Sequence, residues 1–324
     1  MTVLVTGAAG FIGYHVCKAL LARGESVVGI DSLNSYYAVS LKKDRLAQLE
    51  PESGFQFHHV DIADEPAMRS LFQTHRFRRV VHLAAQAGVR YSIDHPMDYA
   101  HSNLVGHLVM LEMCRSVDGF EHLVYASSSS VYGGNTSLPF SLSDRTDNPV
   151  SLYAATKRSN ELMSFTYSHL YGIPATGLRF FTVYGPWGRP DMAVFLFTQA
   201  ILNSKPIKVF NNGDMKRDFT FIDDIVAGVV AILDGPPAAT AGAPHALYNI
   251  GNNRSEPLLK FIAVLEQAIG REAVKTMEPM QPGDVKETYA DIEDIRRDFG
   301  YEPSTPIEVG LPKFVAWYRG YYGV

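Results

Sequence analysis

A glycine-rich segment near the N-terminus constrains the fold more than any other feature of the sequence. Thr6-Gly7-Ala8-Ala9-Gly10-Phe11-Ile12-Gly13 has the spacing G-x-x-G-x-x-G, follows an apolar strand-like run and opens a helical pattern. Glycine at these positions permits a tight turn and a close approach of the backbone to a pyrophosphate, and the helix N-terminus supplies amide donors. The segment therefore predicts the first strand–turn–helix unit of a dinucleotide-binding fold.

The first half of the chain alternates short apolar runs with helical patterns. Strand-like runs span Val3–Thr6, Ser26–Ile30, Phe55–His59, Val80–Leu83 and His122–Ala126, and helical patterns span Ile12–Ala22, Leu41–Leu49, Pro66–Thr74 and Tyr99–Arg115. Strands that alternate with helices form right-handed crossover units, which place helices on both faces of a parallel sheet. The sequence therefore predicts an α/β fold with a Rossmann-type doubly wound parallel sheet.

The second half is less regular and is expected to form a smaller C-terminal α/β region that binds the substrate. A helix at Tyr153–Leu170 and a strand at Ala175–Phe180 are followed by glycine- and proline-rich turns and shorter elements. We expect a dinucleotide-binding Rossmann domain over residues 1–180, which includes the helix that starts at Tyr153, and a substrate-binding region over residues 181–324. Crossings of the chain are expected to interleave the two regions.

Asp31 stands at the end of the second strand-like run, 18 residues past Gly13. A carboxylate at this spacing binds the ribose hydroxyls of the adenosine and repels a 2′-phosphate, so NAD is favoured over NADP. The alternative is an aspartate that only caps a turn. Further cofactor contacts are expected where the next two strands end, although the first of these residues also fits a helix N-cap: Asp61, Ile62, Leu83, Ala84 and Ala85.

Tyr153 and Lys157 form a Y-x-x-x-K pair, which places both side chains on one face of a helix, one turn apart. A tyrosine with a pKa of about 10 is a poor base at neutral pH. A lysine ammonium nearby, together with the positive ring of NAD, is expected to stabilise the phenolate and lower that pKa. The pair alone is also typical of a surface helix.

Four hydroxyl side chains, from Ser127 to Ser130, follow the fifth strand-like run. In an open parallel sheet, ligands lie at the carboxyl ends of the strands. Four consecutive serines pack poorly in a core but suit the hydroxyl groups of a sugar. Ser128 lies 25 residues before Tyr153, and these serines are candidate sugar contacts.

Together these features resemble the extended short-chain dehydrogenases of the NAD-dependent epimerase/dehydratase family, over essentially the whole chain. Within that family the sequence is most similar to the UDP-glucuronate 4-epimerases. The stretches that carry the similarity are residues 31–37 (DSLNSYY), 86–92 (QAGVRYS), 148–157 (NPVSLYAATK), 179–192 (RFFTVYGPWGRPDM) and 215–220 (MKRDFT). The long stretch 179–192 is specific enough that a chance match to these enzymes is hard to accept.

The resemblance implies a cofactor and a reaction. The chain would hold NAD tightly and interconvert UDP-glucuronic acid and UDP-galacturonic acid. Tyr153 would remove the 4-hydroxyl proton, Lys157 would hold the nicotinamide ribose, and Ser128 would hydrogen-bond to the 4-oxygen. Hydride would pass from C4 to NAD, the 4-keto sugar would turn over in the pocket, and the hydride would return to its other face. The implied cofactor contacts also include Asn34 and Asn103.

Two related reactions compete with epimerisation. Dehydratases of the family carry an Asp-Glu pair after the fifth strand, whereas this chain has Ser129 and Ser130, which cannot do that acid–base work. Decarboxylases of the family exploit the easy loss of CO2 from a 4-keto glucuronate, which is a β-keto acid. An epimerase must hold the carboxylate, and Thr182 and Arg189 are the candidates. The alternative for Arg189 is a loop residue paired with Asp191.

The nucleotide is expected to lie mainly against the second half of the chain. Arg217 is the best candidate for the diphosphate, because an arginine fits phosphate oxygens. Gln281 stands where hexose-specific relatives have a second arginine, so Arg90 or Lys216 would compensate. The remaining substrate candidates, each open to an interpretation as ordinary packing, are Gln86, Phe210 for stacking on uracil, and Asp284 for a ribose hydroxyl.

Composition and patterning limit the other partners. The net charge of −5 argues against nucleic acid or an anionic membrane. No apolar run approaches the roughly 18 residues that span a bilayer, and no signal peptide is visible, so a cytoplasmic protein is expected. Cys17 and Cys114 lie in apolar helical patterns and are interpreted as small buried side chains. The histidines do not converge on a ligand spacing, so no metal is expected.

The family resemblance also predicts a homodimer, formed by the helices at Tyr99–Arg115 and Tyr153–Leu170. Three other functions stay open at this point: a 4-epimerase for another UDP-hexose, a UDP-glucuronate decarboxylase, and a non-catalytic NAD-binding sensor. The presence of both Tyr153 and Lys157 argues against the last of these.

Overall fold

The computed structural model describes residues 2–239, 242–280 and 285–324. Seven strands form its main sheet: β1 (Thr2–Thr6), β2 (Ser26–Asp31), β3 (Phe55–His59), β4 (Arg79–His82), β5 (His122–Ser128), β6 (Ala175–Phe180) and β11 (His245–Ile250). Their order is β11-β6-β5-β4-β1-β2-β3. Each pair of neighbours is parallel, so the predicted Rossmann-type sheet is confirmed.

The strand order reverses at β1, which lies between β2 and β4. Thr6, the last residue of β1, stands opposite Ile30 on one side and His82 on the other. The glycine-rich segment leaves β1 at this point, and the amides of Gly7 and Ala8 donate to the Ile30 carbonyl at 2.8 and 3.1 Å. Because ligands of open α/β sheets bind where the strand order reverses, the topology marks the position of the site.

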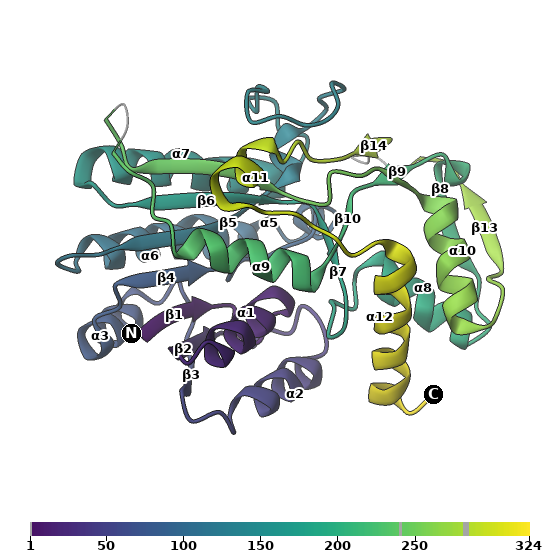
Figure 1. Cartoon of the computed structure of the whole chain (residues 1–324), viewed down its shortest axis with the longest axis horizontal. Helices are drawn as coiled ribbons and strands as arrows, with labels where there is room; N and C mark the ends of the chain where they lie inside the picture. The colour runs from purple at the N-terminus through teal and green to yellow at the C-terminus, as the bar shows by residue number, and fades with distance from the viewer. Residues whose placement is uncertain (1, 240–241, 281–284) are drawn as a thin grey trace.

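Helices cover both faces of the sheet (Figure 1). α1 (Phe11–Ala22) packs against α2 (Val39–Leu49) and α9 (Ile222–Leu233) on one face. α3 (Glu65–His75), α6 (Gly106–Arg115) and α7 (Leu152–Tyr171) succeed one another on the other face. The inner strands β1, β5 and β6 are almost wholly buried as a consequence, and two buried clusters form, one on each face.

The smaller region is built from short pairs of strands and from helices. β7 (Thr182–Tyr184) pairs with β10 (Phe219–Phe221), β8 (Ile207–Phe210) with β13 (Lys275–Glu278), and β9 (Lys216–Arg217) with β12 (Glu256–Pro257) and β14 (Glu287–Thr288). The helices of this region are α8 (Ala193–Leu202), α10 (Leu258–Ile269), α11 (Glu293–Phe299) and α12 (Ile307–Tyr322). In Figure 1, α12 runs between the helices of the main sheet and the pair α8 and α10.

The chain crosses between the two regions after residue 180. α9 packs on α1, and β11 adds to the edge of the main sheet by pairing with β6 from His245 opposite Ala175 to Ile250 opposite Phe180. These crossings tie the smaller region to the sheet on more than one side. The site between the regions is therefore held by a continuous core.

Several boundaries differ from the sequence-based expectation. The helix expected over Tyr99–Arg115 is interrupted: α5 (Pro96–Tyr99) is followed by a π-helical segment, Ala100–Val105, before α6 starts. α8 and β11 were not expected from the sequence. Cys17 and Cys114 are free and fully buried, which confirms their interpretation as core residues. None of the described helices combines the length and apolarity that a bilayer crossing requires.

Candidate active site

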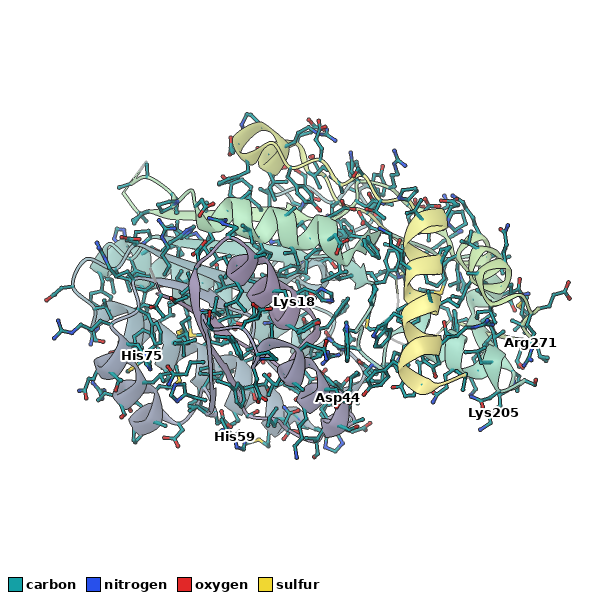
Figure 2. All side chains as sticks on the ribbon, turned by 60° about the horizontal axis from the view of Figure 1, so that its bottom comes forward. Lys18, Asp44, His59, His75, Lys205 and Arg271 are labelled. Atoms are coloured by element: carbon teal, nitrogen blue, oxygen red, sulfur yellow. The ribbon has the colours of Figure 1, made fainter. Side chains whose placement is uncertain are left out.

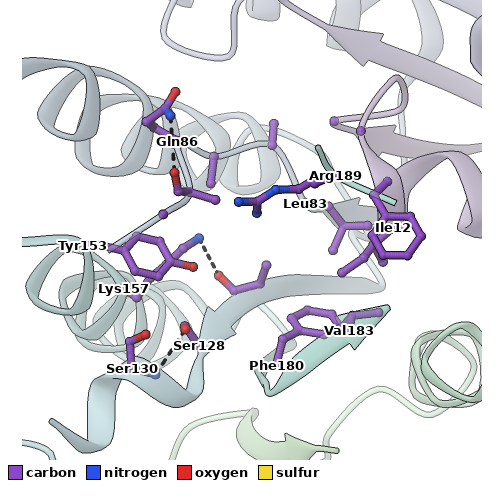
Figure 3. Close-up of a pocket in the computed structure, with 18 of the residues that line it drawn as sticks. Ile12, Leu83, Gln86, Ser128, Ser130, Tyr153, Lys157, Phe180, Val183 and Arg189 are labelled. Atoms are coloured by element: carbon purple, nitrogen blue, oxygen red, sulfur yellow. Dashed lines mark hydrogen bonds between the residues drawn. The ribbon is translucent and has the colours of Figure 1, made fainter. Parts of the chain in front are cut away.

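A cavity of about 490 Å³ opens where the strand order reverses, between the two regions. The carboxyl ends of β1, β2, β4 and β5 line one side of it, and β7, Arg189 and β9 line the other. Figure 3 shows Tyr153, Lys157 and Ser128 together on one side, with the Arg189 guanidinium projecting into the same space. The cavity therefore brings the two halves of the predicted site together.

Most residues proposed from the sequence line this cavity. The cofactor candidates in its wall are Gly7, Gly10, Phe11, Ile12, Gly13, Asp31, Asn34, Asp61, Ile62, Leu83, Ala84 and Ala85. The catalytic and substrate candidates in its wall are Gln86, Ser128, Ser129, Ser130, Tyr153, Lys157, Thr182, Arg189 and Arg217. Outside the wall lie Arg90, Asn103 and Phe210. Asp284, like Gln281, falls outside the described residues.

The glycine-rich turn has no room for side chains. Gly7 has a φ of +72°, and a Cβ there would lie 2.9 Å from the amide nitrogen of Ala84. A Cβ on Gly13 would lie 2.0 Å from the carbonyl oxygen of Gly7. The turn therefore packs its backbone directly against Leu83 and Ala84, which follow β4, and leaves the start of α1 open to the cavity. Such a bare turn before a helix N-terminus fits the pyrophosphate of a dinucleotide.

The Asp31 carboxylate lines the cavity beside the glycine-rich turn. It is buried and accepts hydrogen bonds from the amides of Ala9 at 3.2 Å and Leu33 at 2.8 Å. The turn-capping alternative is thus confirmed, and because the side chain also lines the cavity, its contact with the ribose stays a prediction. A carboxylate in this place repels a 2′-phosphate, so the residues present fit NAD.

Asp61 also lines the cavity and is not the helix cap. The N-cap of α3 is Asp64, whose side chain accepts from the Ala67 amide. Asp61 instead accepts from the Ala63 amide at 2.9 Å, and its other oxygen lies 3.1 Å from His101 Nε2. Because Asp64 caps α3, the interpretation of Asp61 as the helix cap is wrong.

Asn103 lies outside the cavity wall and is hydrogen-bonded to Gln86, which lines it. Its Oδ1 accepts from the Gln86 amide at 2.8 Å, and its Nδ2 donates to the Gln86 carbonyl and to Thr156 Oγ1, both at 3.0 Å. The π-helical segment turns this side chain inward, where it is 2% exposed. Asn103 thus fixes the segment after β4, and its contact with the cofactor stays a prediction.

Tyr153 and Lys157 share one face of α7, as the spacing predicts. The helix starts with Ser151, whose side chain accepts from the Ala154 amide, and this cap fixes the first turn that carries Tyr153. Lys157 is buried, and its Nζ donates to the Ala126 carbonyl at 2.9 Å. Burial lowers the pKa of Lys157 to about 8.

The pKa of Tyr153 is raised in the protein alone. Burial is the main cause, while a hydrogen bond with Ser128 and the charge of Arg189 act in the opposite direction. The lowered pKa expected from Lys157 and the NAD ring together is therefore not a property of the chain alone. The ammonium of Lys157 is directed to a carbonyl of β5, so the phenolate needs the positive charge that the cofactor brings.

A buried ion pair positions α7 against the end of β5. Arg179 on β6 donates to both carboxylate oxygens of Glu161 at 2.8 and 2.9 Å. The hydroxyl of Ser127 donates to the same carboxylate at 2.6 Å. This network ties α7, which carries Tyr153, to the ends of β5 and β6, and it was not predicted from the sequence. The i, i+4 spacing of Lys157 and Glu161, which puts both on the buried face of α7, was the available signal.

Arg189 is held by an acidic neighbour at the rim of the cavity. Its Nε and Nη2 donate to the two oxygens of Asp191 at 3.0 and 2.5 Å, and Tyr36 Oη donates to Asp191 at 3.0 Å. The pairing with Asp191 raised as an alternative is thus confirmed, and Arg189 still lines the cavity. Tyr36 and Lys42, which also line it, were missed, although Tyr36 lies in one of the stretches that carry the resemblance.

The residues proposed for the nucleotide are spread along the outer end. Arg217 lines the cavity, and its Nη1 donates to the carbonyls of Lys216 and Lys286 at 2.8 and 3.1 Å. The Arg90 guanidinium lies over the Phe210 ring, 4.9 Å from its centroid. The Phe210 ring therefore pairs with Arg90 in this structure, and its stacking on uracil stays a prediction.

Comparison with known proteins identifies the relatives of this chain. It is 49% identical over 333 residues to UDP-glucuronate 4-epimerase 2 of Arabidopsis thaliana, which covers 99% of this chain and 76% of that protein. It is 35% identical, with a TM-score of 0.92, to UDP-glucuronic acid 4-epimerase from Bacillus cereus, solved with UDP-glucuronic acid and NAD, over 99% of this chain and 100% of that one. UDP-glucose 4-epimerase from Thermotoga maritima, solved with UDP-glucose, is 29% identical with a TM-score of 0.88, over 99% and 100% of the two chains.

The sequence model of one family matches the chain over residues 3–251. These residues include the glycine-rich turn, the end of β5, the Tyr153 helix and the Arg189 segment. The protein therefore belongs to the NAD dependent epimerase/dehydratase family.

Proposed function

We propose that this protein is an NAD-dependent UDP-glucuronate 4-epimerase, which interconverts UDP-glucuronic acid and UDP-galacturonic acid. The observation that carries the proposal is a single cavity in which Tyr153 and Ser128 share the space with Arg189 and Thr182. The first pair suits chemistry at a sugar hydroxyl, and the second pair suits a sugar carboxylate. The relatives from Arabidopsis thaliana and Bacillus cereus support the same reaction.

The glycine-rich turn and Asp31 would hold NAD, which would supply the hydride acceptor for oxidation at C4 and the hydride donor for reduction from the opposite face. Oxidation and reduction balance over one cycle, so the reaction needs no external oxidant or reductant. We assign the nicotinamide ribose to Lys157, because this residue is buried and lines the same cavity. The chain's own task is to move one proton and to hold the sugar.

Tyr153 performs the proton transfer. Its phenolate accepts the proton of the 4-hydroxyl as C4 becomes a ketone, and its phenol returns that proton to the 4-oxygen after the sugar has turned. Ser128 hydrogen-bonds to the same oxygen and to Tyr153. Because burial raises the pKa of Tyr153, the positive neighbours are needed to populate the phenolate. A base positioned in this way contributes roughly 10²–10⁴ to the rate.

Arg189 and Thr182 hold the carboxylate during the keto stage. If the C5–C6 bond broke at that stage, CO2 would leave, C5 would gain a proton, and a 4-keto pentose would remain. The Asp191 pair uses Nε and Nη2 of Arg189, which leaves Nη1 for the substrate. A guanidinium that bridges two carboxylates keeps a fixed direction, and this fixes the plane of the sugar carboxylate relative to the ketone.

Proton NMR of the purified protein with UDP-glucuronate and no added reductant tests the proposal. The expected product is UDP-galacturonate. A UDP-pentose or 4-keto pentose as the main product would show a decarboxylase and refute the role given to Arg189 and Thr182. Turnover of UDP-glucose or UDP-N-acetylglucosamine alone would keep oxidation at C4 and replace the substrate. Bound NAD without any turnover would identify a sensor.

We also propose a homodimer in the cytoplasm, as expected from the resemblance. Large apolar side chains stand exposed on the outer sides of α6 and α7, including Leu108, Leu162 and Phe165 at 42%, 53% and 51%. Leu162→Glu should give a monomer in size-exclusion chromatography with light scattering. Leu259→Glu, at a similarly exposed residue of α10, is the control and should leave the dimer intact. A wild-type monomer at micromolar concentration contradicts the dimer.

A further inference from the structure

Arg45 is a fully buried arginine on α2, and all five of its hydrogen bonds go to neutral oxygens. A buried charge is costly unless every donor is satisfied, and backbone carbonyls here replace the usual carboxylate partner. The residue lies outside the cavity wall and has no place in the chemistry described above. The positions of the oxygens that accept its hydrogen bonds indicate the role of Arg45.

The guanidinium joins two segments of the site. Its Nη1 donates to the Ala9 carbonyl in the glycine-rich turn and to Tyr37 Oη, both at 2.8 Å. Its Nε and Nη2 donate to the Trp187 carbonyl at 3.1 and 2.7 Å, and Nη2 also reaches the Gly188 carbonyl at 3.2 Å. Gly188 directly precedes Arg189. One side chain thus ties the cofactor turn to the segment that presents the carboxylate ligand.

A second side chain extends the same contact. His15 on α1 lies with Nε2 3.0 Å from the Pro186 carbonyl, so the carbonyls of three successive residues, 186–188, are held by α1 and α2. The middle residue, Trp187, has a φ of +62°, a backbone conformation that residues other than glycine rarely adopt. Its ring packs against Tyr14, Trp317 and Tyr321. The segment is therefore fixed in an unfavourable backbone conformation from several sides.

The orientation of Arg189 itself is set from the same half of the molecule. Asp191 accepts two bonds from Arg189 and one from Tyr36 Oη. Tyr36 is the neighbour of Tyr37, to which Arg45 donates. Hydrogen bonds from residues 15, 36 and 45 thus converge on the six residues 186–191, which include Arg189.

We infer that Arg45 is a positioning residue, which couples the cofactor turn to the carboxylate ligand Arg189 and so protects the keto sugar from losing CO2. The inference rests on the proposed function. An arginine is required because its planar group serves four oxygens in different directions, whereas a lysine ammonium is a point donor on a shorter reach. The cofactor-binding half thereby decides where the substrate carboxylate is held.

The test is the ratio of CO2 release to epimerisation in Arg45→Lys, measured by NMR of the sugar products and by trapping CO2. Loss of one or more hydrogen bonds should raise this ratio about threefold to tenfold, and the KM for UDP-glucuronate with it. Arg271→Lys is the control: Arg271 also donates to a backbone carbonyl, of Leu202 at 2.8 Å, but lies at the outer end of the smaller region (Figure 2). It should keep the wild-type ratio.

A double variant separates positioning from general damage. In an Arg189→Gln background, Arg45→Lys should raise the ratio no further, because its effect passes through Arg189. An unchanged ratio in Arg45→Lys with a lower Tm, or a full additional increase in the double variant, would overturn the inference. If the Arg45 variants fail to fold, His15→Gln tests the same contact through Pro186. Wild-type turnover in the same assay tests the proposed function separately.

Discussion

The substitution Gly13→Ala tests how the cofactor turn is built. The added Cβ would lie 2.0 Å from the Gly7 carbonyl oxygen and 2.7 Å from the Gly7 carbonyl carbon, where ordinary contact begins near 3.4 Å. Both neighbours are backbone atoms of the tight turn, so relief requires roughly 1.4 Å of backbone movement. Overpacking of this kind costs about 1–3 kcal/mol. We expect the bound NAD to fall at least about fivefold, and Tm by roughly 2–10 °C.

The assay is the NAD released from denatured, purified protein, together with Tm by scanning fluorimetry. The control is Gly320→Ala, at an exposed residue of α12 where an added Cβ meets no atom within 4 Å. Alanine is a better helix former than glycine, so the control should raise stability by up to about 1 kcal/mol and keep NAD bound. A Gly13→Ala protein with wild-type NAD content and Tm would refute the account of the turn.

Three further substitutions test separate parts of the site and the core. Tyr153→Phe should lower kcat by about 10²–10⁴ while NAD content and Tm stay at wild-type values; residual activity near wild type would remove Tyr153 as the base. Asp31→Ser should weaken NAD roughly tenfold and reduce the preference over NADP, measured by titrating stripped protein with each cofactor. Burial lowers the pKa of His122 to about 4 from an unfolded value of 6.5, so the stability that depends on its neutral form is complete above pH 6.5 and is lost toward pH 4. Urea unfolding of His122→Gln should therefore show a shallower fall in stability over that range, and an unchanged fall would show that other groups dominate.

The order of the main sheet follows from short-range patterns in the first half of the chain. The glycine-rich turn, the apolar strands and the aspartate at the end of β2 each identify a local unit, and right-handed crossovers leave few ways to combine them. The return of the chain through α9 to β11 has no such signal. His245–Ile250 mixes polar and apolar residues and becomes a strand only because the edge of β6 is open to it.

The site was predictable where one residue type is required by the chemistry. Tyr153, Lys157 and the serines after β5 carry a spacing that the helix and strand periods convert directly into position. The π-helical segment that carries Asn103 was not predicted, because its sequence pattern does not distinguish it from an α-helix. Arg45 could not be found, since its partners are carbonyls far along the chain and only the fold brings them together.

The central claim is that the hydrogen removed from C4 is the one that returns to it. UDP-glucuronate that carries deuterium at C4, incubated with the protein in ordinary water, tests this most directly. We expect UDP-galacturonate that keeps the deuterium at C4, with no hydrogen taken up there from the solvent. Loss of the deuterium to water would contradict it, because the C4 hydrogen would then leave as a proton and the roles given to NAD and Tyr153 would both fail.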